Sequence, residues 1–99
     1  MATKVRRSSG NVFQKLGFSV EEAANLRIRA DLMIQLRKLI EARGLTQAEA
    51  AKLLRISQPR VSDLMRGKID VFSIDTLVNM VTHAGGDVSL VVKPRSKVA

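Results

Sequence analysis

Side chains that can bind nucleic acid are concentrated between residues 47 and 66. A glutamine amide can both donate and accept hydrogen bonds at the edge of adenine, and an arginine can bind guanine or a phosphate. A serine hydroxyl can contact either a base or a phosphate. Val61 and Leu64 share one face of a predicted short helix, so the polar residues on its other face are expected to point outward. An exposed helix fits the major groove of DNA. The candidate DNA-binding residues are Gln47, Ser57, Gln58, Pro59, Arg60, Ser62, Asp63 and Arg66.

Asp63 is unusual within this set, because a carboxylate that faces DNA repels phosphates. It lies three residues from both Arg60 and Arg66, so on a helix it can pair with either arginine and orient it. The alternative is a hydrogen bond accepted from a cytosine amine. The glutamines and arginines could also be ordinary solvated helix residues, but their position at two predicted helix starts and at the groove edge favours a DNA role.

The sequence contains no pattern typical of catalysis or metal binding. It has no Cys and a single histidine, His83, which excludes a thiolate zinc site and a histidine cluster. We interpret His83 as an ordinary helix residue. Asp70, Asp75 and Asp87 are too widely separated to indicate a carboxylate pair. We therefore predict that the protein is not an enzyme and has neither a cofactor nor a metal site.

The net charge predicts an anionic partner. The chain has 17 Lys and Arg against 9 Asp and Glu, a formal charge of +8, which favours nucleic acid or an acidic protein surface. Basic residues outnumber acidic ones in both tails and across 52–68. The tails are either solvated, disordered ends or arms that contact phosphates. Single-stranded RNA is disfavoured, because three Phe and no Tyr or Trp provide few platforms for base stacking.

No apolar run approaches the roughly 20 residues of a membrane span, and no apolar segment follows the basic N-terminus as in a signal peptide. We therefore expect a cytoplasmic protein that does not bind membranes.

Four helices are predicted to position these residues, each beginning at a Ser or Thr whose side chain can cap it. The predicted caps are Ser19, Thr46, Ser57 and Ser73. Glycines after the first, third and fourth helices predict their ends. The first helix is long, and its alanine- and arginine-rich first half could form a separate helix.

Residues 87–92 alternate in the manner of a β-strand. Val88, Leu90 and Val92 share one face and are expected to cover the helical core. A lone strand leaves its backbone groups unpaired, so we expect two copies to pair antiparallel across a two-fold axis. These three residues are therefore candidate dimerisation residues. The competing outcome is that the strand joins the sheet of a partner protein.

Residues 45–67 resemble the DNA-binding core of the Cro/repressor-like family, also called the XRE family. The features at the family's spacing are Leu45-Thr46-Gln47, Gln58, Val61-Ser62 and Arg66-Gly67. The resemblance implies that Gln47 braces Gln58, that Gln58 contacts bases and that the next helix supports dimerisation. Arg55 stands where the family usually has glycine. A left-handed arginine costs about 1 kcal/mol, so we expect the turn to differ in shape.

The segments 11–18 and 68–73 resemble those of small HigA-type antitoxin regulators. This second resemblance implies a protein partner, a RelE-like toxin that cleaves mRNA, and repression of the protein's own operon.

Together these observations predict an all-α protein, a compact helical bundle with a helix-turn-helix and one C-terminal β-strand. The predicted division is a flexible basic N-terminal arm with a short packed segment (1–18), a DNA-binding domain (19–86), a dimerisation strand (87–92) and a basic tail (93–99). The predicted function is that of a dimeric repressor that reads a palindromic operator in double-stranded DNA. The alternative is an antitoxin whose main role is to bind and neutralise a RelE/HigB-like toxin.

Overall fold

The computed structural model describes residues 13–94, and helices are the only regular elements in that range. A helical turn at residues 13–15 precedes the larger elements. These are α2 (Val20–Ala42), α3 (Gln47–Leu54), α4 (Gln58–Met65), the 3₁₀ helix η1 (Ile69–Val71) and α5 (Ile74–His83). The predicted all-α class is thereby confirmed. Most of the basic residues that give the two tails their charge, Lys4, Arg6, Arg7, Arg95 and Lys97, lie outside the described residues.

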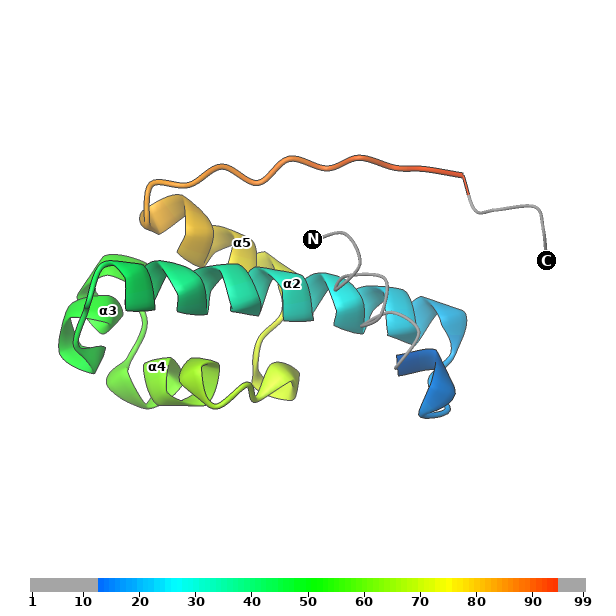
Figure 1. The fold of residues 1–99 in the computed structure, drawn as a ribbon, viewed down its shortest axis with the longest axis horizontal. Helices are drawn as coiled ribbons and strands as arrows, with labels where there is room; N and C mark the ends of the chain where they lie inside the picture. The colour runs from blue at the N-terminus through cyan, green and yellow to red at the C-terminus, as the bar shows by residue number, and fades with distance from the viewer. Residues whose placement is uncertain (1–12, 95–99) are drawn as a thin grey trace.

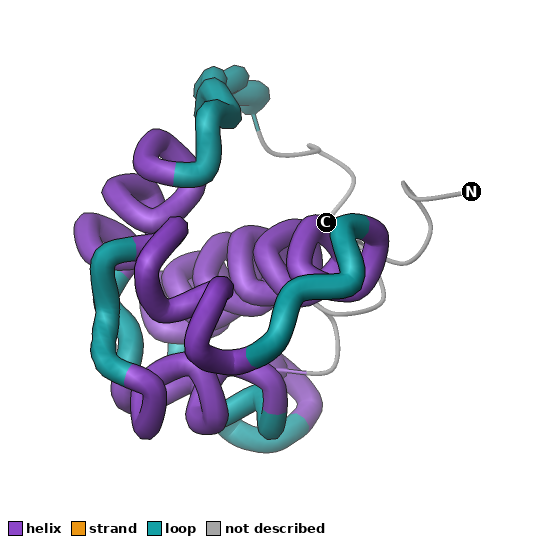
Figure 2. The backbone as a smooth tube through the Cα atoms, turned by 90° about the vertical axis from the view of Figure 1, so that its left-hand side faces the viewer, coloured by secondary structure: helices purple, strands orange, loops and turns teal. Residues whose placement is uncertain are grey.

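The long helix α2 is the scaffold on which the other helices are arranged (Figure 1). It is one continuous helix of 23 residues, so its first half does not form a separate helix. It contacts α5, α4 and η1, while α3 contacts α4 and α5. The shorter helices gather around the C-terminal part of α2 (Figure 1), and Figure 2 views the molecule from that end.

All four predicted N-caps are present. Each cap side chain accepts a hydrogen bond from the backbone amide three residues further on, at Ser19, Thr46, Ser57 and Ser73. The first two caps also form reciprocal capping boxes with Glu22 and Glu49. These contacts satisfy amides that a helix start leaves without partners, so the helix starts follow from short-range chemistry.

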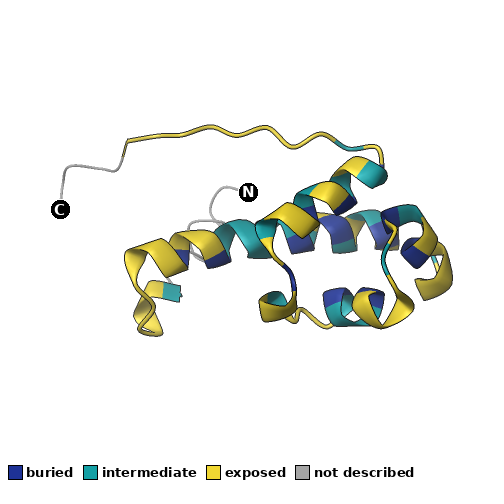
Figure 3. Ribbon diagram, turned by 180° about the vertical axis from the view of Figure 1, so that it is seen from behind, coloured by how far each residue is buried: buried dark blue, intermediate teal, exposed yellow. Residues whose placement is uncertain are grey.

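The hydrophobic core lies where α2, α3, α4 and α5 meet, and Figure 3 shows the buried residues facing one another there. No polar or charged side chain is buried among the described residues. Leu54, Val61, Leu64 and Leu77 are fully buried, at 0% exposure. The apolar cluster comprises Met33, Leu36, Ile40, Ala50, Ala51, Leu54, Val61, Leu64, Phe72, Leu77, Met80 and Ala84.

The predicted C-terminal strand over residues 87–92 is wrong. Residues 86–94 form neither helix nor strand, and Figure 1 shows an extended trace running past α2. Leu90 and Val92 are 79% and 84% exposed, so they do not cover the core as we expected. Alternation gives a segment the pattern of a strand, but a strand needs a hydrogen-bonded neighbour. No other described segment of the chain provides one.

Candidate nucleic-acid interface

The candidate interface is built on α3 and α4, whose starts are set by neighbouring caps. The Thr46 hydroxyl accepts from the Glu49 amide at 3.1 Å, and the Glu49 carboxylate accepts from the Thr46 amide at 2.8 Å. The Ser57 hydroxyl accepts from the Arg60 amide at 3.3 Å. Pro59 lies in the first turn of α4, where the missing amide removes no helical hydrogen bond. Ser57 therefore defines where α4 begins.

The turn between α3 and α4 has a left-handed residue at Arg55, with φ 59° and ψ 45°. The amides of Arg55 and Ile56 both donate to the Ala51 carbonyl oxygen. Ile56 then packs against the core. We expected a differently shaped turn because arginine disfavours this conformation. The structure instead places the arginine itself in the conformation that glycine would adopt most easily.

The outward face of α4 carries most of the predicted DNA-binding residues. Val61 and Leu64 are fully buried against the core, and this fixes the rotation of the helix about its axis. Ser62 and Asp63 are partly exposed. The exposed members of the set are Gln47, Ser57, Gln58, Pro59, Arg60 and Arg66. The structure thus presents polar and basic groups together along one side of α4.

Gln47 and Gln58 are the first residues of α3 and α4. The family resemblance implied that Gln47 braces Gln58. No hydrogen bond joins the two side chains in the described part of the chain. Both amides therefore keep their donors and acceptors for a ligand.

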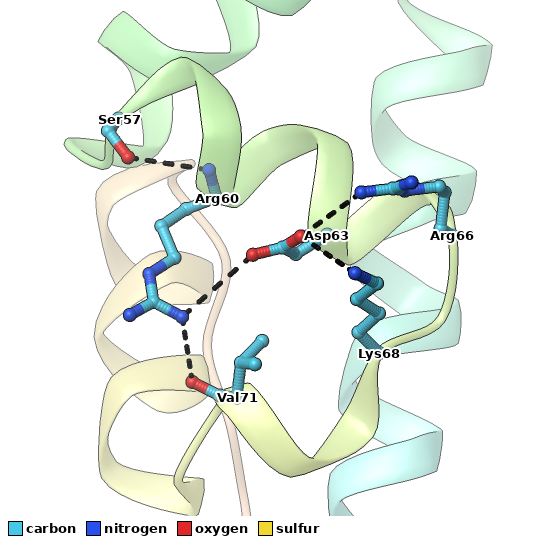
Figure 4. A network of polar contacts seen from close by, with 6 residues as sticks. All are labelled: Ser57, Arg60, Asp63, Arg66, Lys68 and Val71. Carbon is cyan, nitrogen blue, oxygen red and sulfur yellow. Dashed lines mark hydrogen bonds and ion pairs between the residues drawn. The ribbon is translucent and has the colours of Figure 1, made fainter.

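Asp63 is the centre of a cluster of basic side chains (Figure 4). Its carboxylate lies 3.5 Å from the Arg66 guanidinium and 4.0 Å from that of Arg60. We predicted pairing with either arginine, and the structure contains both pairs. It also lies 3.9 Å from the Lys68 ammonium. Arg60 in addition donates to the Val71 carbonyl oxygen at 3.3 Å.

Lys68 is a candidate residue that the sequence analysis missed. It follows α4 and Gly67, whose φ is +72°. The Lys68 amide donates to the Asp63 carbonyl oxygen at 3.0 Å and the Gly67 amide to that of Leu64 at 3.1 Å, the pair of bonds that defines a Schellman motif. The Arg-Gly-Lys sequence after an amphipathic helix was the available signal for this turn.

Two side chains, Arg29 and His83, fasten the interface to the scaffold through long-range hydrogen bonds. The Arg29 guanidinium of α2 donates to the carbonyl oxygens of Ile69, at 3.2 Å, and Phe72, at 3.4 Å. His83 Nδ1 of α5 lies 3.2 Å from the Leu54 carbonyl oxygen, to which it donates. His83 is therefore a helix residue with a structural contact. These bonds hold the end of α3 and the segment after α4 in place.

Metal binding and membrane insertion find no support in the described residues. They contain no group of His, Cys, Asp or Glu arranged to hold a metal ion. None of their helices is both long enough and apolar enough to cross a bilayer.

Comparison with known proteins agrees with this geometry. Over 59 residues the chain is 37% identical to "Putative antitoxin HigA2" of Mycobacterium tuberculosis, an alignment that spans 60% of this chain and 58% of that protein. It therefore matches somewhat more than half of the length of that relative. A solved structure titled "Putative XRE Family Transcriptional Regulator" superposes with a TM-score of 0.71 at 29% identity, covering 79% of this chain and 88% of the other.

The family assignment rests on a longer match. The model of the family described as "Helix-turn-helix domain" matches residues 15–93, which include every element from α2 to α5. The resemblance to XRE-type regulators found in the sequence is thereby confirmed, and this chain belongs to the helix-turn-helix domain family.

Proposed function

We propose that this protein is a sequence-specific transcriptional regulator that inserts α4 into the major groove of DNA. The observation that carries the proposal is the face of α4, where exposed polar and basic side chains lie opposite the fully buried Val61 and Leu64. The width of a helix matches the major groove, where each base pair presents a distinct pattern of donors and acceptors. The family supports the same use of the second helix of the motif.

The proposed roles of the individual residues follow from their position. Gln58, at the first turn of α4, reaches a base edge, because the N-terminal residues of a recognition helix enter the groove first. Arg60 and Arg66 lie at the flank and far end of α4, where an arginine can bind a guanine edge or a phosphate. Lys68 follows them, beside the phosphates that line the groove. Gln47 at the start of α3 and the Ser62 hydroxyl add polar contacts.

The proposed regulator acts as a dimer on a palindromic operator. Two copies of α4 related by a two-fold axis would occupy major grooves about 34 Å apart, and the bound dimer would block access of RNA polymerase. We propose that the exposed apolar side chains of the C-terminal segment, Val88, Leu90 and Val92, contribute to the contact between the two copies. Exposed apolar surface of this kind favours association.

A second candidate function is neutralisation of a toxin protein. The observation that favours it is the 37% identity to a relative whose name describes an antitoxin. In that case this chain would bind both its DNA and a RelE/HigB-like protein. Co-purification with the product of a neighbouring gene would support this function, and failure of the two purified proteins to associate would exclude it.

Substitution of Gln58 tests the base-reading role directly. Gln58→Ala should cost about 1–3 kcal/mol of binding energy on the preferred duplex and little on random DNA. Binding can be measured by fluorescence anisotropy, with a duplex selected from a randomised library by the wild-type protein. Gln35→Ala on α2 is the matched control, because Gln35 is also an exposed helical glutamine. Equal losses on both duplexes would refute the base-reading role.

A further inference from the structure

We propose that Asp63 determines specificity by holding three basic side chains of the DNA face and lowering their attraction for any phosphate. This inference rests on the proposed DNA-binding function and adds a role for the one acidic residue on that face. The carboxylate lies 3.5 Å from Arg66, 3.9 Å from Lys68 and 4.0 Å from Arg60. It is thus a positioning residue, which acts on DNA through its neighbours.

The fold brings all three cations to one carboxylate by two separate routes. Arg60 lies one turn before Asp63 on α4, and Arg66, the C-cap of the helix, lies about one turn after it, so both side chains can reach the Asp63 carboxylate. Lys68 lies beyond the helix, but the left-handed Gly67 reverses the chain there. Asp63 therefore accepts the Lys68 amide at its carbonyl oxygen and faces the Lys68 ammonium with its carboxylate.

The exposed fractions of the four side chains indicate which of them are accessible to DNA. The Asp63 side chain is 20% exposed, whereas Arg60, Arg66 and Lys68 are 49%, 61% and 50% exposed. The carboxylate lies between the cations (Figure 4) and is less exposed than they are, so the cations remain accessible to phosphates. It therefore cancels part of their charge without blocking them sterically.

This arrangement acts unequally on random DNA and on an operator. Binding to random DNA depends almost wholly on attraction between cations and phosphates, so a carboxylate within the cationic cluster weakens it fully. Binding to an operator also uses base contacts, and these need side chains held in defined positions. Asp63 weakens binding to random DNA and supports the base contacts made to an operator. It therefore raises the specificity ratio, which is the affinity for the operator divided by the affinity for random DNA.

Asp63→Asn should therefore strengthen binding to random DNA and narrow the specificity ratio. A phosphate bound by these cations would lie roughly twice as far from the carboxylate as the cations do, where repulsion between unit charges in water corresponds to roughly a threefold change in affinity. We therefore expect random-DNA affinity to rise roughly threefold. Affinity for the selected duplex should rise less or fall. The slope of log affinity against log salt on random DNA should steepen by up to about 0.9 for each additional phosphate contact.

The experiment compares the full-length wild-type protein with Asp63→Asn, Asp63→Glu and Glu21→Gln, on the selected duplex and a scrambled one. Glu21 is an exposed acid at the start of α2, far along the scaffold from α4 (Figure 1), so its variant controls for net charge. Asp63→Glu keeps the charge and should retain most of the specificity ratio. Thermal unfolding of each variant shows whether the fold is intact.

The outcomes separate this inference from the proposed function. The role of Asp63 is supported if the specificity ratio of Asp63→Asn is smaller than that of the wild type while the ratio of Glu21→Gln is unchanged. If the wild-type protein prefers the selected duplex but Asp63→Asn changes both affinities by the same factor, the inference fails and the DNA-binding function stands. If the wild-type protein shows no preference for any duplex, the proposed function fails, and the inference fails with it.

Discussion

Replacing Arg55 with glycine should stabilise this protein, although it removes a large side chain. Arg55 is the only non-glycine residue in the described part of the chain with a positive φ, 59°. Its side chain is exposed and makes none of the hydrogen bonds or ion pairs found there. Arg55→Gly therefore removes backbone strain without removing a favourable side-chain contact.

The magnitude follows from two opposing terms. The left-handed conformation costs a residue with a Cβ atom about 1–2 kcal/mol, and glycine removes this cost. Glycine in turn loses more backbone freedom on folding, at about 0.5–1 kcal/mol. The net gain is about 0.5–1 kcal/mol, which for a domain of this size raises Tm by roughly 2–8 °C.

Two further variants isolate the backbone effect. Arg55→Ala removes the same charge but keeps a Cβ atom in the left-handed turn, so it should leave Tm nearly unchanged. Gly44→Ala makes the reverse change at the end of α2, where φ is +61° and an added Cβ meets nothing within 4 Å. It should lose the same 0.5–1 kcal/mol, about the amount that Arg55→Gly gains.

Urea and thermal unfolding followed by circular dichroism measure all three variants. The selected duplex provides a second measurement, and its affinity for Arg55→Gly should match the wild type, because the turn keeps its shape. A Tm for Arg55→Gly at or below that of the wild type would refute the strain argument. An equal rise in Arg55→Ala would show that relief of charge repulsion, not of strain, is responsible.

Two other predictions concern the start of α4 and the C-terminal segment. Ser57→Ala removes the cap of α4 and should cost about 1 kcal/mol of stability, measurable as a lower urea midpoint, whereas Ser57→Asp should retain most of it; an unchanged midpoint in Ser57→Ala would contradict the capping role. Leu90→Asp places a charge on a side chain that is 79% exposed, so it should leave the Tm of the monomer unchanged but weaken dimerisation and operator binding together, as measured by sedimentation equilibrium and anisotropy. A dimer of unchanged stability would remove Leu90 from the proposed interface.

Helix boundaries and the exposed face of α4 were predictable because both depend on residues close together in sequence. A cap at Ser19 or Thr46 acts on an amide only three residues away. The 3.6-residue repeat placed Val61 and Leu64 on the side of α4 opposite Pro59 and Ser62. The pairing of Asp63 with Arg60 and Arg66 was likewise within one helical turn, and the structure contains both ion pairs.

Contacts between distant residues could not be predicted in this way. Arg29 reaches Ile69 and Phe72, 40 and 43 residues further along the chain, and His83 reaches back 29 residues to Leu54. No local pattern specifies these pairs, because they exist only once α2 and α5 have packed on the helix-turn-helix. Lys68 joins the Asp63 cluster for a related reason, since its position depends on the turn at Gly67.

Arg55 and residues 87–92 show where tertiary structure overrode a local preference. Arginine disfavours the left-handed region, yet packing of Ile56 and of α3 against α4 holds Arg55 there, because burial of apolar side chains outweighs a cost of about 1 kcal/mol. The alternation of residues 87–92 is a genuine local signal, but a strand is a relation between two segments. The described chain provides no second segment, so the pattern remains an exposed, extended stretch whose backbone groups are free to pair with another molecule.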